Sequence, residues 1–181
     1  LSEAGFTKGK GETLMDASGQ RVEFDLYTNA GNRDREQIAA ILKQDLTALG
    51  MKVNFKPLDF NNLTERLQSN FEWDVILIGF TGTRDPHFGS NLYLSNGPQH
   101  FWYPNQPKPA TAWEAEVDRL MDQGSREMDR AKRAEIYQQY AVIQAEDLPV
   151  LYAWADIKRE GLRATVDTTA GYQNDTPTWF R

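Results

Sequence analysis

The sequence feature that most constrains the fold is an unbroken apolar run that ends at a glycine. Val75 to Ile78 are consecutive apolar, mostly β-branched residues, and Gly79 and Phe80 follow them directly. A run without an alternating polar side is typical of a strand buried on both faces of a sheet. We therefore predict that this segment is a central strand of an α/β protein.

The residues that follow this strand are the first candidates for a binding site. In open α/β sheets, ligands bind just beyond the carboxyl ends of such strands. An ordinary exit from a strand into a loop would give the same pattern, so both interpretations stay open. The candidate ligand-binding residues at this position are Phe80, Thr81, Gly82, Thr83 and Asp85.

The N-terminal third of the chain predicts a strand and a long helix. Arg21 to Tyr27 alternates apolar and polar side chains, as a half-buried strand does. After a loop at residues 28–32, Asn32 is placed to cap a helix whose apolar residues recur at helical spacing. We expect this helix to end at Gly50.

A second alternating strand is predicted from Met51, followed by a short helix capped by Asn61 or Asn62. The order strand, helix, strand, helix, strand indicates right-handed crossovers and a largely parallel sheet. The loop that contains Asn29 and the loop after Phe80 would then lie along the same edge of the sheet.

The C-terminal half is irregular at first and then helical. Residues 85–109 are rich in Gly, Pro, Asn and aromatic side chains, and we expect helices at Trp113–Met121 and from an Asp129 cap to about Glu146. Val150 to Ala155 is predicted as one more apolar strand. Residues 1–181 are thus expected to form a single α/β lobe, with a mixed, mostly parallel sheet flanked by helices.

Sequence signatures of enzymes are absent. No Gly-x-x-x-x-Gly-Lys, Gly-x-Gly-x-x-Gly or Gly-x-Ser-x-Gly motif occurs. Asp85, His87 and Ser90 share one loop, but they lack the scaffolded geometry that a catalytic triad requires. We predict that the chain is not an enzyme and has no catalytic residue.

Metal, nucleic-acid and membrane functions are also disfavoured. Asp85, His87 and His100 could in principle bind a divalent metal, but hydrogen-bonded loop histidines are the simpler interpretation, and we predict neither a metal nor a cofactor. The chain has no cysteine, which rules out disulfides and thiolate metal sites. Its net charge of −6 and the lack of a basic tract argue against nucleic acid as a partner. No apolar run approaches the roughly 20 residues of a membrane helix.

The aromatic residues of the loop have two interpretations. Phe80, Trp102 and Tyr103 lie near small polar residues, and such combinations often line small-molecule pockets. Alternatively, Trp102 and Tyr103 pack the long loop onto the sheet. An alternative function is a protein-interaction module that uses the aromatic loop 100–104 as its docking surface.

Several motifs, taken in order, carry a resemblance to a known family. They are Leu1-Ser2-Glu3-Ala4-Gly5-Phe6, the helix within Arg35–Val53 ending in Leu-Gly-x-x-Val, the segment Trp73–Pro86, Asp129–Arg133 with Tyr137, and Glu146–Pro149. With these motifs the chain resembles the C-terminal lobe of extracellular solute-binding proteins of family 5, the peptide- and nickel-binding components of ABC importers. The likeness covers about residues 1–165.

The resemblance implies a type II periplasmic binding protein whose two lobes close on a small-molecule or peptide-like ligand. The chain would then be one lobe of a longer, periplasmic or extracellular receptor, either free or lipid-anchored. Its partners would be the N-terminal lobe of the same protein and an ABC permease in the membrane.

The resemblance also implies site residues. In peptide-binding members, an aspartate three residues after the strand-end aromatic residue pairs with the α-amine of the ligand, and Thr83 stands at that position here. Asp85 could replace that aspartate, or it could serve only as a turn residue before Pro86. Further ligand contacts of this lobe would map onto Thr28, Asn29 and Ala30, and Asn29 could either bind the ligand or only satisfy the turn.

Overall fold

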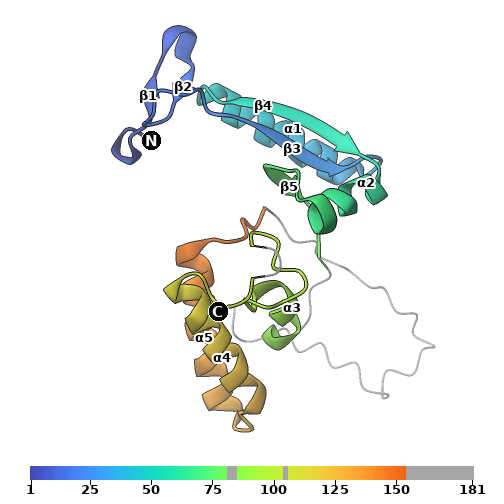
Figure 1. Ribbon diagram of the computed structural model, residues 1–181, viewed down its shortest axis with the longest axis vertical. Coiled ribbons are helices and arrows are strands. Elements are labelled where there is room, and N and C mark those ends of the chain that lie inside the picture. Colours follow the sequence, from blue (N-terminus) through green and yellow to red (C-terminus); the bar gives the residue numbers. More distant parts are fainter. Residues whose placement is uncertain (81–84, 104–105, 154–181) are drawn as a thin grey trace, which may run out of the picture. The chain divides into compact units, whose positions relative to one another are not determined.

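The computed structural model describes residues 1–80, 85–103 and 106–153, which divide into an N-terminal unit within Leu1–Thr81 and a C-terminal unit within Gly82–Arg181 (Figure 1). The single lobe predicted for residues 1–181 stays a prediction. The N-terminal unit contains a parallel sheet, and the described part of the C-terminal unit is helical.

The sheet of the N-terminal unit has three strands in the order β4-β3-β5, all parallel. These are β3 (Glu23–Asn29), β4 (Lys52–Leu58) and β5 (Val75–Leu77). The parallel sheet predicted from the alternation of strands and helices is confirmed. The strand predicted to be central is at an edge, however: β5 pairs only with β3 in the described part of the chain, and Val75 is 39% exposed.

Strand β3 takes the central place because both neighbours pair with it. Leu26 lies opposite Phe55 of β4 and Val75 of β5. Leu26 and Thr28 are completely or almost completely buried. An apolar run alone cannot distinguish a central strand from an edge strand, because both can be shielded by other parts of a protein.

Helix α1 (Arg33–Ala48) covers one face of this sheet (Figure 1). It begins as predicted, with the Asn32 side chain accepting a hydrogen bond from the Arg35 backbone at 3.1 Å. Ala39 packs with Leu26 and Val53 in the core between the helix and the sheet. The other face is polar, and the Asp25 carboxylate of β3 binds Lys56 of β4 at 2.6 Å.

Short elements complete the N-terminal unit. They are the 3₁₀ turns η1 (Ser2–Ala4) and η2 (Lys10–Glu12), the antiparallel strands β1 (Thr7–Lys8) and β2 (Leu14–Met15), helix α2 (Phe60–Glu65) and the π-helical turn η3 (Arg66–Asn70). Asp59 caps α2 by accepting from the backbones of Asn61 and Asn62, both at 3.1 Å. The predicted cap at Asn61 or Asn62 was therefore wrong, because Asp59 lies just before the first turn and reaches both donors.

The C-terminal unit is built on two neighbouring helices, α4 (Ala112–Arg126) and α5 (Arg130–Asp147), preceded by η4 (Pro86–Gly89) and α3 (Ser90–Tyr93) (Figure 1). Asp129 caps α5, as predicted, by accepting from the Lys132 backbone at 3.0 Å. The buried core residues are Tyr93, Val117, Leu120, Met121, Ile136, Tyr137 and Tyr140.

The strand predicted at Val150–Ala155 is not formed in its described part. Residues 150–153 have no strand pairing, and residues 154–155 lie outside the described residues. Val150 instead packs against the helical core of the C-terminal unit. Leu151 and Tyr152 are 78% and 72% exposed. Periodicity over so few residues does not separate a strand from such a segment.

Candidate functional site

The carboxyl ends of β3 and β5 lie side by side in the N-terminal unit. Thr28 is paired in parallel register with Leu77, so Asn29 and Ala30 leave the sheet next to Ile78, Gly79 and Phe80. Ligands of open α/β sheets bind at such an edge. The sequence-based expectation that these two exits share one edge holds for the residues that the structure describes.

Three of the predicted ligand-binding residues lie at the end of β3. The Thr28 hydroxyl is buried and donates a hydrogen bond to the Leu77 carbonyl at 2.8 Å. The Asn29 Oδ1 atom accepts a hydrogen bond from Arg35 at 2.6 Å, and the Ala30 backbone donates to the Leu58 carbonyl at 2.6 Å. All three are thus fixed by contacts within the unit, and their contact with a ligand stays a prediction.

Arg35 was not predicted from the sequence, although its side chain reaches both Asn29 at the end of β3 and Gly79 after β5. It stands in the first turn of α1, and its Nη1 atom donates to Asn29 Oδ1. Its Nη2 atom lies close to Gly79: a Cβ atom added to Gly79 would be 2.6 Å from this nitrogen. The available signal was its position three residues after the helix cap that follows β3. We call Asn29, Arg35, Gly79 and Phe80 the strand-end cluster.

The candidates after β5 are only partly described. Phe80 is 48% exposed. Thr81, Gly82 and Thr83 lie outside the described residues. Their predicted role in ligand binding stays a prediction.

Asp85 belongs to the C-terminal unit, where its carboxylate binds the His87 backbone and the Arg133 side chain. Its Oδ1 atom accepts from the His87 backbone at 2.9 Å, which confirms the predicted turn before Pro86. Both oxygens also bind Arg133, at 2.7 and 2.9 Å. Hydrogen bonds from Arg133 hold the pKa of Asp85 below its usual range, so the carboxylate is ionised at neutral pH.

Trp102 is part of the core of the C-terminal unit. Its ring lies 4.0 Å from the ring of His100 and 6.2 Å from those of Tyr93 and Trp113, measured between centroids. Its indole nitrogen donates to Glu114 at 3.2 Å. The predicted packing of Trp102 onto the sheet was therefore wrong: its recorded partners are helix and loop residues of the C-terminal unit. Tyr103 is 47% exposed.

Glu114 anchors this loop through a buried carboxylate. Its oxygens accept hydrogen bonds from the backbones of Ala110 at 2.8 Å and Thr111 at 2.9 Å, and from Gln106 at 3.1 Å. Burial by itself raises the pKa of Glu114, but these hydrogen bonds outweigh burial and lower that pKa to about 2. The carboxylate is therefore a structural anion.

His100 is held by contacts within the C-terminal unit. His100 is buried, with Nε2 3.3 Å from Glu114 and Nδ1 3.3 Å from the Leu92 carbonyl. Within residues 1–80, 85–103 and 106–153, no group of three or more His, Asp or Glu side chains could hold a metal ion. In the same residues, no helix has the length and apolar character needed to cross a membrane.

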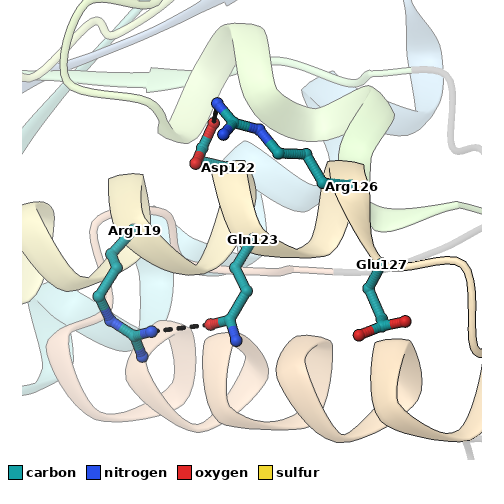
Figure 2. Close-up of a pocket in the computed structure, with 5 residues that line it drawn as sticks. All are labelled: Arg119, Asp122, Gln123, Arg126 and Glu127. Carbon is teal, nitrogen blue, oxygen red and sulfur yellow. Dashed lines mark hydrogen bonds and ion pairs between the residues drawn. The ribbon is translucent and has the colours of Figure 1, made fainter.

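A shallow surface hollow of about 420 Å³ lies along α4 (Figure 2). Its lining is polar or charged: Arg119, Asp122, Gln123, Arg126 and Glu127. Arg119 donates to Gln123 at 2.7 Å, and Arg126 pairs with Asp122 at 2.6 Å. Small-molecule sites are mostly apolar with a few polar groups, so we do not regard this hollow as the ligand site.

Comparison with known families decides the class of the protein. Residues 1–101 match the model described as bacterial extracellular solute-binding proteins, family 5 middle. The chain belongs to this family. The matched residues include the whole described sheet and the strand-end cluster of this solute-binding protein.

Two curated relatives extend the comparison of this family 5 chain. The oligopeptide-binding protein AppA of Bacillus subtilis is 28% identical over 159 residues, which are 85% of this chain and 27% of AppA. A probable ABC transporter-binding protein of Deinococcus radiodurans is 31% identical over 176 residues, which are 86% of this chain and 30% of that protein. The chain thus spans less than a third of the length of these relatives.

Solved structures agree with the α/β fold of the family. The AppA structure with a bound nonapeptide matches with a TM-score of 0.68 and 28% identity, over 82% of this chain and 29% of AppA. NikA from Brucella suis, in complex with Fe(III)-EDTA, matches with a TM-score of 0.65 and 21% identity, over 81% of this chain and 29% of NikA. The fold is therefore that of a type II periplasmic binding protein.

Proposed function

We propose that this chain is one lobe of the substrate-binding component of an ABC importer. The complete receptor would capture a peptide-like or other small organic ligand between two lobes and deliver it to a membrane permease. Membership of family 5 and the likeness to AppA and to the Deinococcus radiodurans protein support this proposal.

The observation that carries the proposal is the shared exit of β3 and β5 at one edge of the sheet. At this edge, Phe80 is 48% exposed and would give apolar contact, while the Asn29 amide nitrogen and the Ala30 carbonyl would give polar contacts. Apolar contact area with a few orienting polar groups is the usual composition of a small-molecule site. Thr81, Gly82 and Thr83 would extend the site along the chain.

The proposed binding is non-covalent and needs no catalytic residue. In the complete receptor, closure of the other lobe, which would precede this chain in the sequence, over this edge would remove water from the ligand and strengthen the ligand's polar contacts. The receptor would work in the periplasm or outside the cell, either free or lipid-anchored. Asp85 and Trp102, which are fixed in the core contacts of the C-terminal unit, would support the loop and need not touch the ligand.

The alternative of a protein-interaction module in loop 100–104 has less support. Its largest aromatic side chain, Trp102, packs against Tyr93 and Trp113 and hydrogen-bonds Glu114, so little of it is available for docking. No comparison favours that function.

A thermal-shift screen of the complete two-lobed receptor would test the proposed function. We expect peptides to raise the melting temperature, since a ligand that binds only the folded state stabilises that state. Nickel chelates and sugars would be screened beside the peptides. A screen in which no small molecule of any of these classes changes the melting temperature would contradict the proposal.

A further inference from the structure

Arg35 is the unusual member of the strand-end cluster, because none of the described carboxylates pairs with its charge. The only hydrogen bond of its side chain in the described residues goes to the neutral Asn29. No carboxylate forms an ion pair with Arg35 in that part of the chain. Its Nε atom is buried and has no hydrogen-bond partner.

A partly buried guanidinium group with an unpaired N–H donor is stabilised when an anion binds to it. Removing a charged group from water costs free energy, and a partner of opposite charge compensates for that cost. Arg35 is only half-buried, yet one of its donors is sealed from solvent without a partner. The fold therefore holds a cation with unused hydrogen-bonding capacity at the edge where ligands bind.

The position of this cation is fixed by its surroundings. Asn29 binds Nη1, and Gly79 has no side chain that would displace Nη2. The turn between β3 and α1 is also fixed, because the Gly31 backbone donates a hydrogen bond to Glu36 at 2.8 Å. Glu36, the residue that follows Arg35, thus uses its carboxylate to bind the Gly31 backbone. Preorganised groups bind ligands more tightly because less entropy is lost on binding.

The sequence around the edge offers no competing acid after β5. From Val75 to Arg84 there is no Asp or Glu, and Thr83 stands where the family resemblance implies an amine-binding aspartate. The segment that follows β5 therefore contains no carboxylate that could pair with Arg35. Arginine presents a planar fork of donors that matches a carboxylate.

We propose that Arg35, positioned by Asn29, binds a carboxylate group of the ligand. This inference rests on the proposed function and adds a ligand class to it: an acidic, peptide-like molecule. The carboxylate can come from the carboxyl terminus of a peptide or from an acidic side chain.

Calorimetric titration of the complete receptor with three nonapeptide mixtures would test this assignment. The first mixture lacks Asp and Glu and has a free carboxyl terminus, the second is the same mixture amidated, and the third is amidated but contains one Glu. We expect the first or the third to bind about 30-fold or more tightly than the second, as for a hydrogen-bonded charge pair of 2 kcal/mol or more. Whichever does so identifies the source of the carboxylate.

Variants separate recognition from folding. Arg35→Gln should reduce the affinity for the preferred mixture to the affinity that the wild type has for the second mixture. Its own affinity for the second mixture should stay within about threefold of the wild-type value. Arg35→Lys keeps the charge but not the fork, so we expect an intermediate loss for the preferred mixture only. Lys43→Gln removes an exposed charge of the same helix and should change neither affinity.

Two results would overturn the inference. Equal binding of all three mixtures by the wild type, or an equal loss for all mixtures in both Arg35 variants, would show that Arg35 does not read a carboxylate, while the proposed peptide receptor would stand. Binding of none of the mixtures would contradict both the peptide class and the role of Arg35.

Discussion

At the residue scale, three polar side chains predicted to contact a ligand, all within the described residues, have partners within the protein. Thr28 donates to the sheet, Asn29 holds Arg35, and Asp85 binds Arg133. These residue types were predictable from their positions after strands. Their partners were not, because Arg35 and Arg133 come from helices, and sequence spacing does not give the direction in which long side chains reach.

Asp85→Asn separates the structural role of Asp85 from a ligand-binding one. The variant loses the charged pair with Arg133 but keeps an acceptor for the His87 backbone. We expect the free energy of unfolding to fall by about 1–2 kcal/mol in urea titrations, because the pair is bidentate but partly exposed. Peptide affinity of the complete receptor should not change.

The matched control for that experiment is Asp122→Asn, which breaks a more exposed pair with Arg126. Its effect on stability should stay within about 0.5 kcal/mol. A loss of peptide affinity in Asp85→Asn at unchanged stability would instead assign Asp85 to the ligand site.

Glu114 predicts a specific dependence of stability on pH. Its pKa is about 2 in the folded chain against an ordinary value of 4.5, so the folded state holds its proton less tightly than the unfolded state. The stabilisation, about 3 kcal/mol, is present above pH 4.5 and is lost as the pH falls toward 2. Urea titrations between pH 6 and pH 2.5 would measure this loss.

Glu114→Gln should be less stable than the wild type by about 3 kcal/mol at pH 6 and should show a weaker decline below pH 4.5. Glu116→Gln is the matched control on the same helix, since the Glu116 side chain is 42% exposed and pairs with its helix neighbour Arg119. If both variants followed the wild-type pH profile, the carboxylate of Glu114 would not anchor the loop.

At the element scale, caps and periodicity predicted α1 and α5 well, whereas α4 runs to Arg126, five residues beyond the end predicted at Met121. Asn32 and Asp129 cap α1 and α5 as expected, because an N-cap depends on local chemistry that a sequence displays directly. The order of strands in the sheet was harder. The edge position of β5 depends on which strand pairs with β3 on each side, and that is decided by contacts distant in sequence.

Gly50 shows how a turn residue joins two elements of the N-terminal unit. Its φ of +96° favours glycine, and a Cβ atom would lie 2.1 Å from the Glu12 carbonyl oxygen. Its own carbonyl accepts from the Leu14 backbone at 2.8 Å. We expect Gly50→Ala to lower the free energy of unfolding by about 2–4 kcal/mol, since both strain and a backbone clash oppose it.

Gly19→Ala is the control, because Gly19 has a φ of +77° but nothing within 4 Å of the added methyl group. It should cost only about 1 kcal/mol, the strain of the left-handed backbone. Equal losses in the two variants would mean that the turn at Gly50 does not depend on its contact with Glu12.

At the scale of the whole molecule, the class of protein was predictable and the ligand was not. The family motifs extend over most of the chain, and the family match to residues 1–101 agrees with them. Under the proposed function, ligand identity would depend on a few side chains at the strand ends. Arg35, the charged one among them, lies within a regular helix, where its sequence context resembles that of any exposed arginine.

The most direct test of the account is a calorimetric comparison of the 181-residue chain with the complete two-lobed receptor, using the same peptide mixture. Circular dichroism of the chain would first establish that it is folded. We predict micromolar or tighter binding by the complete receptor and binding at least about 100-fold weaker by the chain, because half of the contacts and the exclusion of water are missing. Equally tight binding by the chain alone would contradict the proposal that the ligand is held between two lobes.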